Sequence, residues 1–166
     1  MLVPALKPER YFSRISKIDV AHDLLGQGLD CVLLDIDNTI RSRETGEVPR
    51  DVRFWLSQAQ AAGVRFCLLS NNWHADVQDF AAGLGLPIVA KACKPLPPAY
   101  LAARRKIGGT RKGTVVIGDQ LSTDVIGAHV LGMQAYLLAP LAEKDLKHTV
   151  VVRKFERQLL GNMVPE

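Results

Sequence analysis

Four short segments of the chain carry side chains that could perform phosphate chemistry, and each follows an apolar run. The segments are residues 35–39 (DIDNT), 70–72 (SNN), 94–95 (KP) and 118–124 (GDQLSTD). Together they supply two carboxylates two positions apart, a hydroxyl group, a lysine and a second acidic pair. Such groups can bind a hard divalent cation and a phosphate at the same time. This combination predicts an enzyme.

The first segment offers a nucleophile and a proton donor. A carboxylate at the end of a strand, here Asp35, can attack phosphorus and form an aspartyl-phosphate. Because carboxylate and phosphate are both negative, the attack needs a cation, and we expect Mg²⁺. Asp37 is expected to act as general acid towards the leaving oxygen and then as general base for water, and its main chain could also bind the metal. Backbone N–H groups at Asn38 and Thr39 would face phosphate oxygens, the simpler alternative being an ordinary turn.

The second and third segments are expected to bind the phosphate. The Ser70 hydroxyl and the N–H groups that follow it can hold a phosphate oxygen, and Asn71 adds a donor at the start of the next helix. The alternative for Ser70 is an ordinary helix cap. Lys94 can neutralise the charge that develops on the transferred phosphoryl group. We prefer it to Lys91 because the proline-rich loop that follows Lys94 would hold it in place.

The fourth segment supplies further carboxylates for a metal ion. Asp119 follows a glycine at a strand end, where its carboxylate could meet the carboxylates of the first segment. The expected ligands of the metal ion are therefore Asp35, Asp37 and Asp119. Asp124 lies near the start of the next helix, where it could orient the metal or its water molecules. The alternative is that Asp124 only stabilises the positive end of that helix.

The elements that must position these residues alternate between strand and helix. Apolar runs at 31–34, 64–69, 87–90, 114–117 and 134–138 are typical of strands covered on both faces. Helical patterns occupy 49–63, 74–82 and 98–107, then a segment from Ser122 or Thr123 to Gly132, with further helices expected at 18–25 and 151–160. The alternation predicts a doubly wound, mostly parallel α/β sheet in one domain over residues 1–166, with a core at 31–138. In such sheets ligands bind at the carboxyl ends of the strands, where the four segments would meet.

Composition restricts the class of protein. The chain has 166 residues, 48% hydrophobic and 23% charged, with a formal charge of +4, which suits an anionic partner but is too mild to indicate nucleic acid. The three cysteines, Cys31, Cys67 and Cys93, are expected to be reduced core residues of a cytoplasmic protein. No apolar run approaches the ~20 residues of a membrane span, and the first residues make a poor signal peptide.

A basic stretch leaves a second partner open. No acidic residue occurs between Phe80 and Gly118, although this stretch contains several basic residues. The simple interpretation is that these bases lie on a solvated surface. The alternative is that they form an electropositive rim that attracts phosphorylated substrates or anionic lipid headgroups. The basic helix expected at 151–160 could lie on a membrane surface or pack on the domain, and a homo-oligomer is also open. The bases of this stretch are Lys91, Lys94, Arg104, Arg105, Lys106, Arg111 and Lys112.

The four segments, in this order and each after a predicted strand, resemble the motifs of the haloacid dehalogenase (HAD) superfamily of phosphotransferases. The forms Asp-x-Asp-Asn-Thr and Gly-Asp-Gln-x-x-Thr-Asp resemble subclass IIIA, and within it the YqeG-type phosphatase family. The resemblance runs from about residue 31 to residue 138. It implies a Rossmann-like sheet of five strands in the order 5-4-1-2-3 and a phosphatase that uses Mg²⁺. Some relatives dephosphorylate phosphatidylglycerophosphate, which makes that lipid an alternative substrate.

The resemblance also implies roles for individual residues. Asp35 would be the nucleophile and Asp37 the acid and base. Ser70 and Lys94 would bind the phosphate. Asp119 would be a Mg²⁺ ligand, with Asp124 beside it.

The spacing of the segments leaves no room for a cap domain. The gaps from Thr39 to Ser70 and from Asn72 to Lys94 hold only a helix and a strand each, so we expect an open site. Such a site fits a large or surface-bound substrate, or a cap from another subunit. A receiver-like signalling module is the rival of another class, but receivers place the phosphorylated aspartate after the third strand. A non-catalytic binding protein would have no need of both Asp35 and Asp37. The sequence thus predicts a Mg²⁺-dependent phosphomonoester hydrolase.

Overall fold

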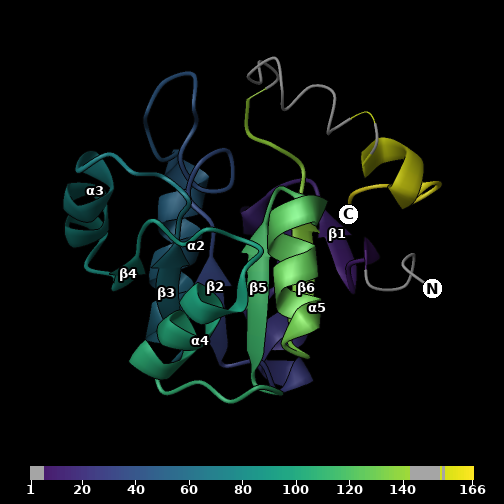
Figure 1. Ribbon diagram of the computed structural model, residues 1–166. Coiled ribbons are helices and arrows are strands. Elements are labelled where there is room, and N and C mark those ends of the chain that lie inside the picture. Colours follow the sequence, from purple (N-terminus) through teal and green to yellow (C-terminus); the bar gives the residue numbers. More distant parts are fainter. Residues whose placement is uncertain (1–5, 143–153, 155) are drawn as a thin grey trace.

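The apolar runs of the sequence form one sheet in the computed structural model of the protein, which describes residues 6–142, 154 and 156–166. The strands are β1 (Arg10–Phe12), β2 (Cys31–Leu34), β3 (Arg65–Leu69), β4 (Ile88–Val89), β5 (Thr114–Gly118) and β6 (Gln134–Leu138). They lie in the order β1-β6-β5-β2-β3-β4, and every neighbouring pair is parallel (Figure 1). All residues of the central strands β2 and β5 are buried, as expected where helices cover both faces.

Helices pack on both faces of this sheet. They are α2 (Arg50–Ala61), α3 (Asp76–Leu84), α4 (Pro97–Lys106) and α5 (Ile126–Val130), with shorter helical turns η1 (Ile15–Lys17), η2 (Val20–Leu24), η3 (Leu25–Gln27) and η4 (Leu121–Val125). Successive residues of β2 alternate between two hydrophobic clusters. Val32 and Leu34 join the cluster formed with α2 and α3, whereas Leu33 joins the one formed with α4, η4 and α5. Figure 1 shows α4 and α5 on the near face of the sheet.

The predicted sheet is confirmed, with one addition. The five expected strands are present, and their spatial order matches the order 5-4-1-2-3 implied by the family resemblance. A sixth strand, β1, pairs parallel with β6, placing Arg10 opposite Tyr136 and Phe12 opposite Leu138. Three residues are too few to show a periodic pattern, so this strand could not be recognised from the sequence.

The helix expected at 18–25 is present as two short helical segments. The structure has the wide turn η2 followed by the tighter turn η3, and no regular α-helix. Asp19 accepts a hydrogen bond from the His22 N–H at 2.7 Å, and its own N–H donates to the Asp23 carboxylate at 2.8 Å. These bonds close the first turn locally. A side chain at Gly26 would meet the Ala21 carbonyl oxygen, so the chain can turn tightly here only with glycine.

Two other helices were expected, one after β5 and one near the C-terminus. Ser122 or Thr123 was expected to cap a helix, but η4 begins at Leu121, and the Thr123 hydroxyl instead donates to the Gln120 side chain at 3.2 Å. Of the helix expected at 151–160, residues 151–153 and 155 lie outside the described part of the chain, and 154 and 156–160 are helical. Leu159 and Leu160 pack against the core cluster that contains Leu33. No helix in the described ranges is long and apolar enough to cross a membrane.

The cysteines divide into two groups. Cys31 and Cys67 are buried free thiols, and burial raises the pKa of each to about 11. The expectation of a core position is wrong for Cys93, which is exposed in the loop after β4, where it has a φ of 53°. Cys93 thus lies on the surface beside Lys94.

The basic stretch does not form one rim. Lys91 and Lys94 lie in the loop after β4, at the carboxyl edge of the sheet. The remaining five bases lie at the end of α4 and in the turn before β5, at the amino edge. Arg65, the first residue of β3, marks that edge by donating to the Ile107 carbonyl at 2.6 Å.

Candidate active site

The four chemical segments meet at the carboxyl edge of the sheet. Asp35 follows β2, Ser70 follows β3 and Asp119 follows β5, while Lys94 lies in the loop after β4. Parallel strands present these ends on the same side, so groups far apart in the sequence face one cleft. The cleft has a volume of about 450 Å³. It is lined by Asp35, Asp37, Arg43, Ser70, Asn71, Asn72, Trp73, His74, Lys94, Gln120 and Thr123.

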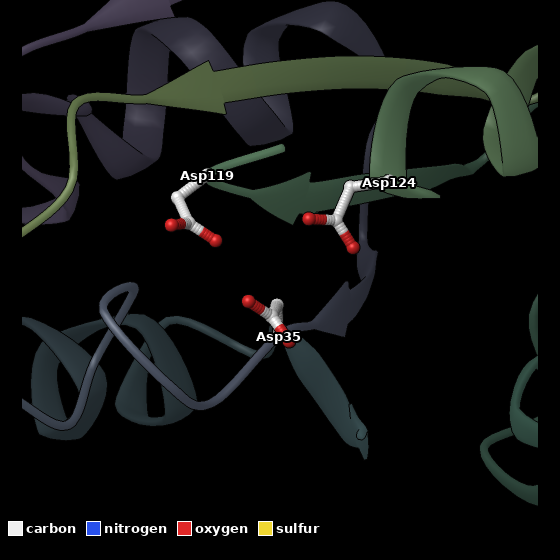
Figure 2. A group of neighbouring side chains, drawn as sticks. All are labelled: Asp35, Asp119 and Asp124. Atoms are coloured by element: carbon white, nitrogen blue, oxygen red, sulfur yellow. The ribbon is translucent and has the colours of Figure 1, made fainter. Parts of the chain in front are cut away.

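Three carboxylates converge at the carboxyl edge of the sheet, and of these Asp35 lines the cleft. Asp35, Asp119 and Asp124 each offer an oxygen, and these oxygens lie within 4.8 Å of one another. Figure 2 shows the three side chains pointing towards a common point, one from the end of β2, one from the end of β5 and one from η4. Asp119 and Asp124 are buried. Hard oxygen ligands at such separations suit a small divalent cation.

Lys94 links two of these carboxylates. Its Nζ donates to Asp35 Oδ1 at 2.8 Å and to Asp124 Oδ1 at 2.7 Å. Burial on its own would lower the pKa of Lys94, but attraction to Asp124 and then Asp35 outweighs it and raises the pKa, so the amine stays protonated. Three carboxylates and one ammonium leave two negative charges, which a divalent cation would neutralise. The donor set therefore fits Mg²⁺ in charge and in ligand type.

Asp124 is more than a helix-end charge. Burial raises its pKa to about 6, while the ammonium of Lys94 opposes that shift and Asp35 adds to it. Its second oxygen accepts from the Gln120 N–H at 3.2 Å. Gly118 makes this position available, because a side chain there would overlap the Asp124 carboxylate.

Asp37 faces the cleft but stands apart from the carboxylate cluster. Its Oδ1 accepts hydrogen bonds from Arg41 Nη2 at 2.8 Å and Arg41 Nε at 3.2 Å. Asp35, Asp119 and Asp124 form the only such metal-sized group in the described part of the chain, so the Asp37 side chain is not among them. Its main-chain carbonyl is the atom by which it could still serve a metal.

Thr39 is turned towards the expected nucleophile. Its hydroxyl donates to Asp35 Oδ2 at 3.1 Å. The side chain is buried and does not line the cleft. The turn that allows this has Asn38 in the left-handed region, with a φ of 59°. The Asn38 N–H donates to the Arg41 carbonyl at 2.7 Å and closes the turn. Thr39 thus orients Asp35, and a phosphate would meet this loop through its backbone.

Ser70 and Asn71 connect the second and third segments. The Ser70 hydroxyl lines the cleft and accepts from the Asn72 N–H at 3.0 Å. The Asn71 side chain accepts from the Lys94 N–H at 2.7 Å and donates to the Lys94 carbonyl at 3.4 Å. Asn71 therefore holds the backbone of Lys94 in place, a contact that spacing alone could not reveal. Lys91, the rival of Lys94, lies on the surface with its Nζ 5.2 Å from the Trp73 ring centre.

Sequence reasoning missed several residues of the cleft. Trp73 is 67% exposed at the rim, and Arg43, His74, Gln120 and Thr123 also contribute to the wall. Trp73 and His74 directly follow the 70–72 segment, and an aromatic residue at that position was a usable signal. His74 is exposed to solvent.

Comparisons with known proteins agree with this geometry. A family model described as HAD-hydrolase-like matches residues 92–140. A Bacillus subtilis protein named "Probable phosphatase YqeG" is 30% identical over 161 residues, which are 97% of this chain and 93% of that protein.

Solved structures share the fold at low sequence identity. An uncharacterized protein from Listeria monocytogenes serotype 4b has a TM-score of 0.56 and 16% identity over 71% of this chain and 85% of its own. The cobalt-bound deoxy-D-mannose-octulosonate 8-phosphate phosphatase YrbI of Haemophilus influenzae has a TM-score of 0.53 and 14% identity over 81% of this chain and 88% of its own. The near full-length match to YqeG, on a fold and motif set of this kind, shows that the chain belongs to the haloacid dehalogenase superfamily, in the family of YqeG-type phosphatases.

Proposed function

We propose that this phosphatase is a Mg²⁺-dependent phosphomonoester hydrolase that works through an aspartyl-phosphate on Asp35. One observation carries the proposal: the buried ammonium of Lys94 bridges Asp35 and Asp124, with Asp119 within reach of both carboxylates. A nucleophile, a fixed cation and a ligand set for a second cation thus occupy one small volume. Cationic groups beside the transferring phosphoryl group stabilise its negative charge in the transition state.

The first chemical step transfers the phosphoryl group to the protein. One oxygen of Asp35 attacks phosphorus and forms an O–P bond, while the bond from phosphorus to the leaving oxygen breaks. Asp37, which lines the same cleft, gives its proton to that oxygen and leaves it as an alcohol.

The second step releases phosphate. Asp37, now ionised, takes a proton from a water molecule whose oxygen attacks phosphorus. The bond between Asp35 and phosphorus breaks, which restores the carboxylate and yields inorganic phosphate. The same residue serves in turn as acid and base, so the two steps need no further side chain for proton transfer.

Several groups would hold the phosphate and the metal. Lys94 and the Ser70 hydroxyl face the cleft from two loops, and Asn71 supports Lys94. The carboxylates of Asp35 and Asp119 would hold the metal, with Asp124 beside them. Mg²⁺, when bound there, would offset the negative charges of the nucleophile and the phosphate. The YrbI phosphatase, which shares this fold, was solved in a cobalt-bound form.

The cleft has space for a phosphorylated substrate with a large leaving group, because no cap domain covers it in the described segments. Only 15 residues separate β2 from α2, and six separate β3 from α3, so no cap domain is inserted in these described segments. Beyond the phosphate, the wall offers an indole, an imidazole, a guanidinium and amide groups, which can contact a polar leaving group. These wall residues are Arg43, Asn72, Trp73, His74 and Gln120.

Hydrolysis of p-nitrophenyl phosphate tests the proposal. We expect turnover with Mg²⁺, loss of turnover in EDTA and loss in Asp35→Asn. Asp30→Asn is the matched control, because Asp30 pairs with Arg65 at the opposite edge of the sheet. Intact-mass measurement of the protein quenched in acid should show a phosphorylated species in the wild type and none in Asp35→Asn. Turnover that persists in EDTA, or in Asp35→Asn, would contradict the mechanism.

A further inference from the structure

We infer that Arg41 is a positioning residue that holds Asp37 in the orientation needed for proton transfer. The inference rests on the proposed function, because it concerns the acid and base of that reaction. It adds a residue outside the four motif segments, one that the sequence analysis did not single out.

Arg41 is held on three sides. Its Nε and Nη2 both donate to Asp37 Oδ1, at 3.2 and 2.8 Å. Its Nη1 donates to Asp76 Oδ2 at 3.3 Å, and the guanidinium carbon lies 4.9 Å from the centre of the Phe80 ring. Asp76 and Phe80 both belong to α3. The Arg41 side chain is only 12% exposed, so this arrangement is a packed one rather than a loose surface pair.

The backbone of Arg41 reinforces the same contact. Asp37 and Arg41 form an isolated parallel bridge, and the Arg41 carbonyl accepts from the Asn38 N–H at 2.7 Å. The Arg41 N–H donates to the Ile36 carbonyl at 3.0 Å. One residue therefore closes the turn that carries Asp37 and also grips the Asp37 carboxylate. A shift of the Asp37 main chain or side chain would therefore break contacts with Arg41.

The hydrogen bonds from Arg41 leave one oxygen of the Asp37 carboxylate available for proton transfer. Both Arg41 donors converge on Oδ1 of Asp37, so we assign Oδ2 to the leaving oxygen and to water. Proton transfer requires a heavy-atom separation of about 2.6–3.2 Å. A displacement of about 1 Å can lower a rate about 100-fold. Because α3 follows the rim segment that contains Trp73 and His74, Arg41 also fixes Asp37 relative to the wall of the cleft.

A double-mutant cycle separates positioning from a general structural effect. The variants are Arg41→Met, Arg41→Lys, Asp37→Asn and the double variant Arg41→Met/Asp37→Asn. Arg14→Met is the control, because Arg14 also donates two hydrogen bonds to an aspartate, Asp51, and neither residue lines the cleft. The assay is steady-state hydrolysis of p-nitrophenyl phosphate with Mg²⁺.

We expect Arg41→Met to lower kcat about 100-fold with little change in KM, and Arg41→Lys to recover part of this loss. In the Asp37→Asn background, Arg41→Met should change kcat by no more than about 2–3-fold. A difference of that size is within the deviation from additivity that is usual for mutations at independent sites. Arg14→Met should keep kcat within the same about 2–3-fold of the wild type. An equal loss on Arg41→Met in both backgrounds would overturn the inference, as would a pure rise in KM.

A crystal structure of Arg41→Met provides a readout that needs no activity. We expect the Asp37 side chain to leave its wild-type rotamer or to occupy more than one. A single, unchanged Asp37 rotamer would overturn the inference even if the protein hydrolysed no phosphate ester. If Arg41→Met fails to fold, Arg41→Lys in the same experiment takes its place, with Asp37 expected to shift because the forked donor is lost. The failure of wild-type turnover alone would instead count against the proposed function.

Discussion

The ammonium of Lys94 lies 2.8 Å from the carboxylate of Asp35, although 59 positions separate the two residues in the chain. The loop after β4 reaches over the end of β3 to make this contact, because β3 lies between β2 and β4 in the sheet. Asn71, which follows β3, grips the backbone of Lys94 on the way. The position of the lysine thus depends on three neighbouring strand ends.

Replacing Lys94 should affect stability and activity together. Lys94→Met leaves Asp35 and Asp124 facing each other without their shared cation, and breaking a buried pair in this way costs about 3–5 kcal/mol. We expect a lower urea midpoint in EDTA and loss of p-nitrophenyl phosphate hydrolysis. Lys91→Met, the same change at an exposed position three residues earlier, should cost at most about 1 kcal/mol through its contact with Trp73. Equal urea midpoints for the two variants would show that the ion pairs of Lys94 with Asp35 and Asp124 do not contribute to the free energy of unfolding.

Metal binding should appear as thermal stabilisation. A ligand that binds only the folded state stabilises it by about 2.7 kcal/mol at 100 times its Kd. We therefore expect Mg²⁺ to raise the Tm in a concentration-dependent way that EDTA reverses. Asp119→Asn, which removes one converging carboxylate, should abolish most of the shift. Asp30→Asn, at the other edge of the sheet, should leave the shift intact, and a shift retained in Asp119→Asn would place the cation elsewhere.

Gly118 should be required for steric reasons. In Gly118→Ala the added methyl group overlaps the Asp124 carboxylate, which must move away from Lys94 and its neighbours. Displacement of a group that supports metal ligands lowers metal affinity about 10–100-fold. Isothermal titration with Mg²⁺ would measure this loss. Gly83→Ala in α3, where a methyl group meets no atom within 4 Å, should instead stabilise the protein by about 0.5–1 kcal/mol.

The pair formed by Arg14 and Asp51 should contribute stability only above acidic pH. The bidentate hydrogen bond from Arg14 lowers the pKa of Asp51 below its ordinary 3.8, against the opposing effect of burial, and Ser16 adds to the lowering. The folded state therefore favours the ionised form. Its stabilising effect is full well above pH 3.8 and is lost as the pH falls through the lower pKa of the folded state.

The variant Asp51→Asn tests this dependence. Both side chains are more than a third exposed, so solvent screening limits the effect at pH 7 to about 0.5 kcal/mol. Urea denaturation of wild type and Asp51→Asn at pH 7 and at pH 3 would measure the difference, which should shrink at the lower pH. A difference that grows on acidification would contradict the assigned sign.

The strands and most helices of this fold follow from local pattern. The helix α2 buries Val52, Trp55, Leu56 and Ala59, whose spacing of i, i+3, i+4 and i+7 places them on one face of a helix. β1 was not predicted because its three residues are held by pairing with β6, more than 120 positions later. Local sequence carries no record of such a partner.

The candidate site was predictable as a set of residues and not as a set of contacts. Asp35, Ser70, Lys94 and Asp119 were expected to converge because parallel strands end at one edge, and the structure brings them to that edge. The grip of Arg41 on Asp37 depends on the exact turn after β2, and no spacing rule encodes it. The roles of Asn71 and Thr39 as supports for Lys94 and Asp35 were hidden for the same reason.

Both margins of the sheet are very short, which bears on how the protein behaves at high concentration. β4 has two residues and β1 has three, and the main chain of Glu166 hydrogen-bonds to Tyr11 and Ser13 beside β1. An unprotected margin exposes a row of unpaired N–H and C=O groups that can recruit other molecules into fibrils. Here the edge strands are so short that few such groups are exposed, which discourages strand pairing between molecules. The carboxyl ends of the strands, which carry the candidate active site, are unaffected by this protection.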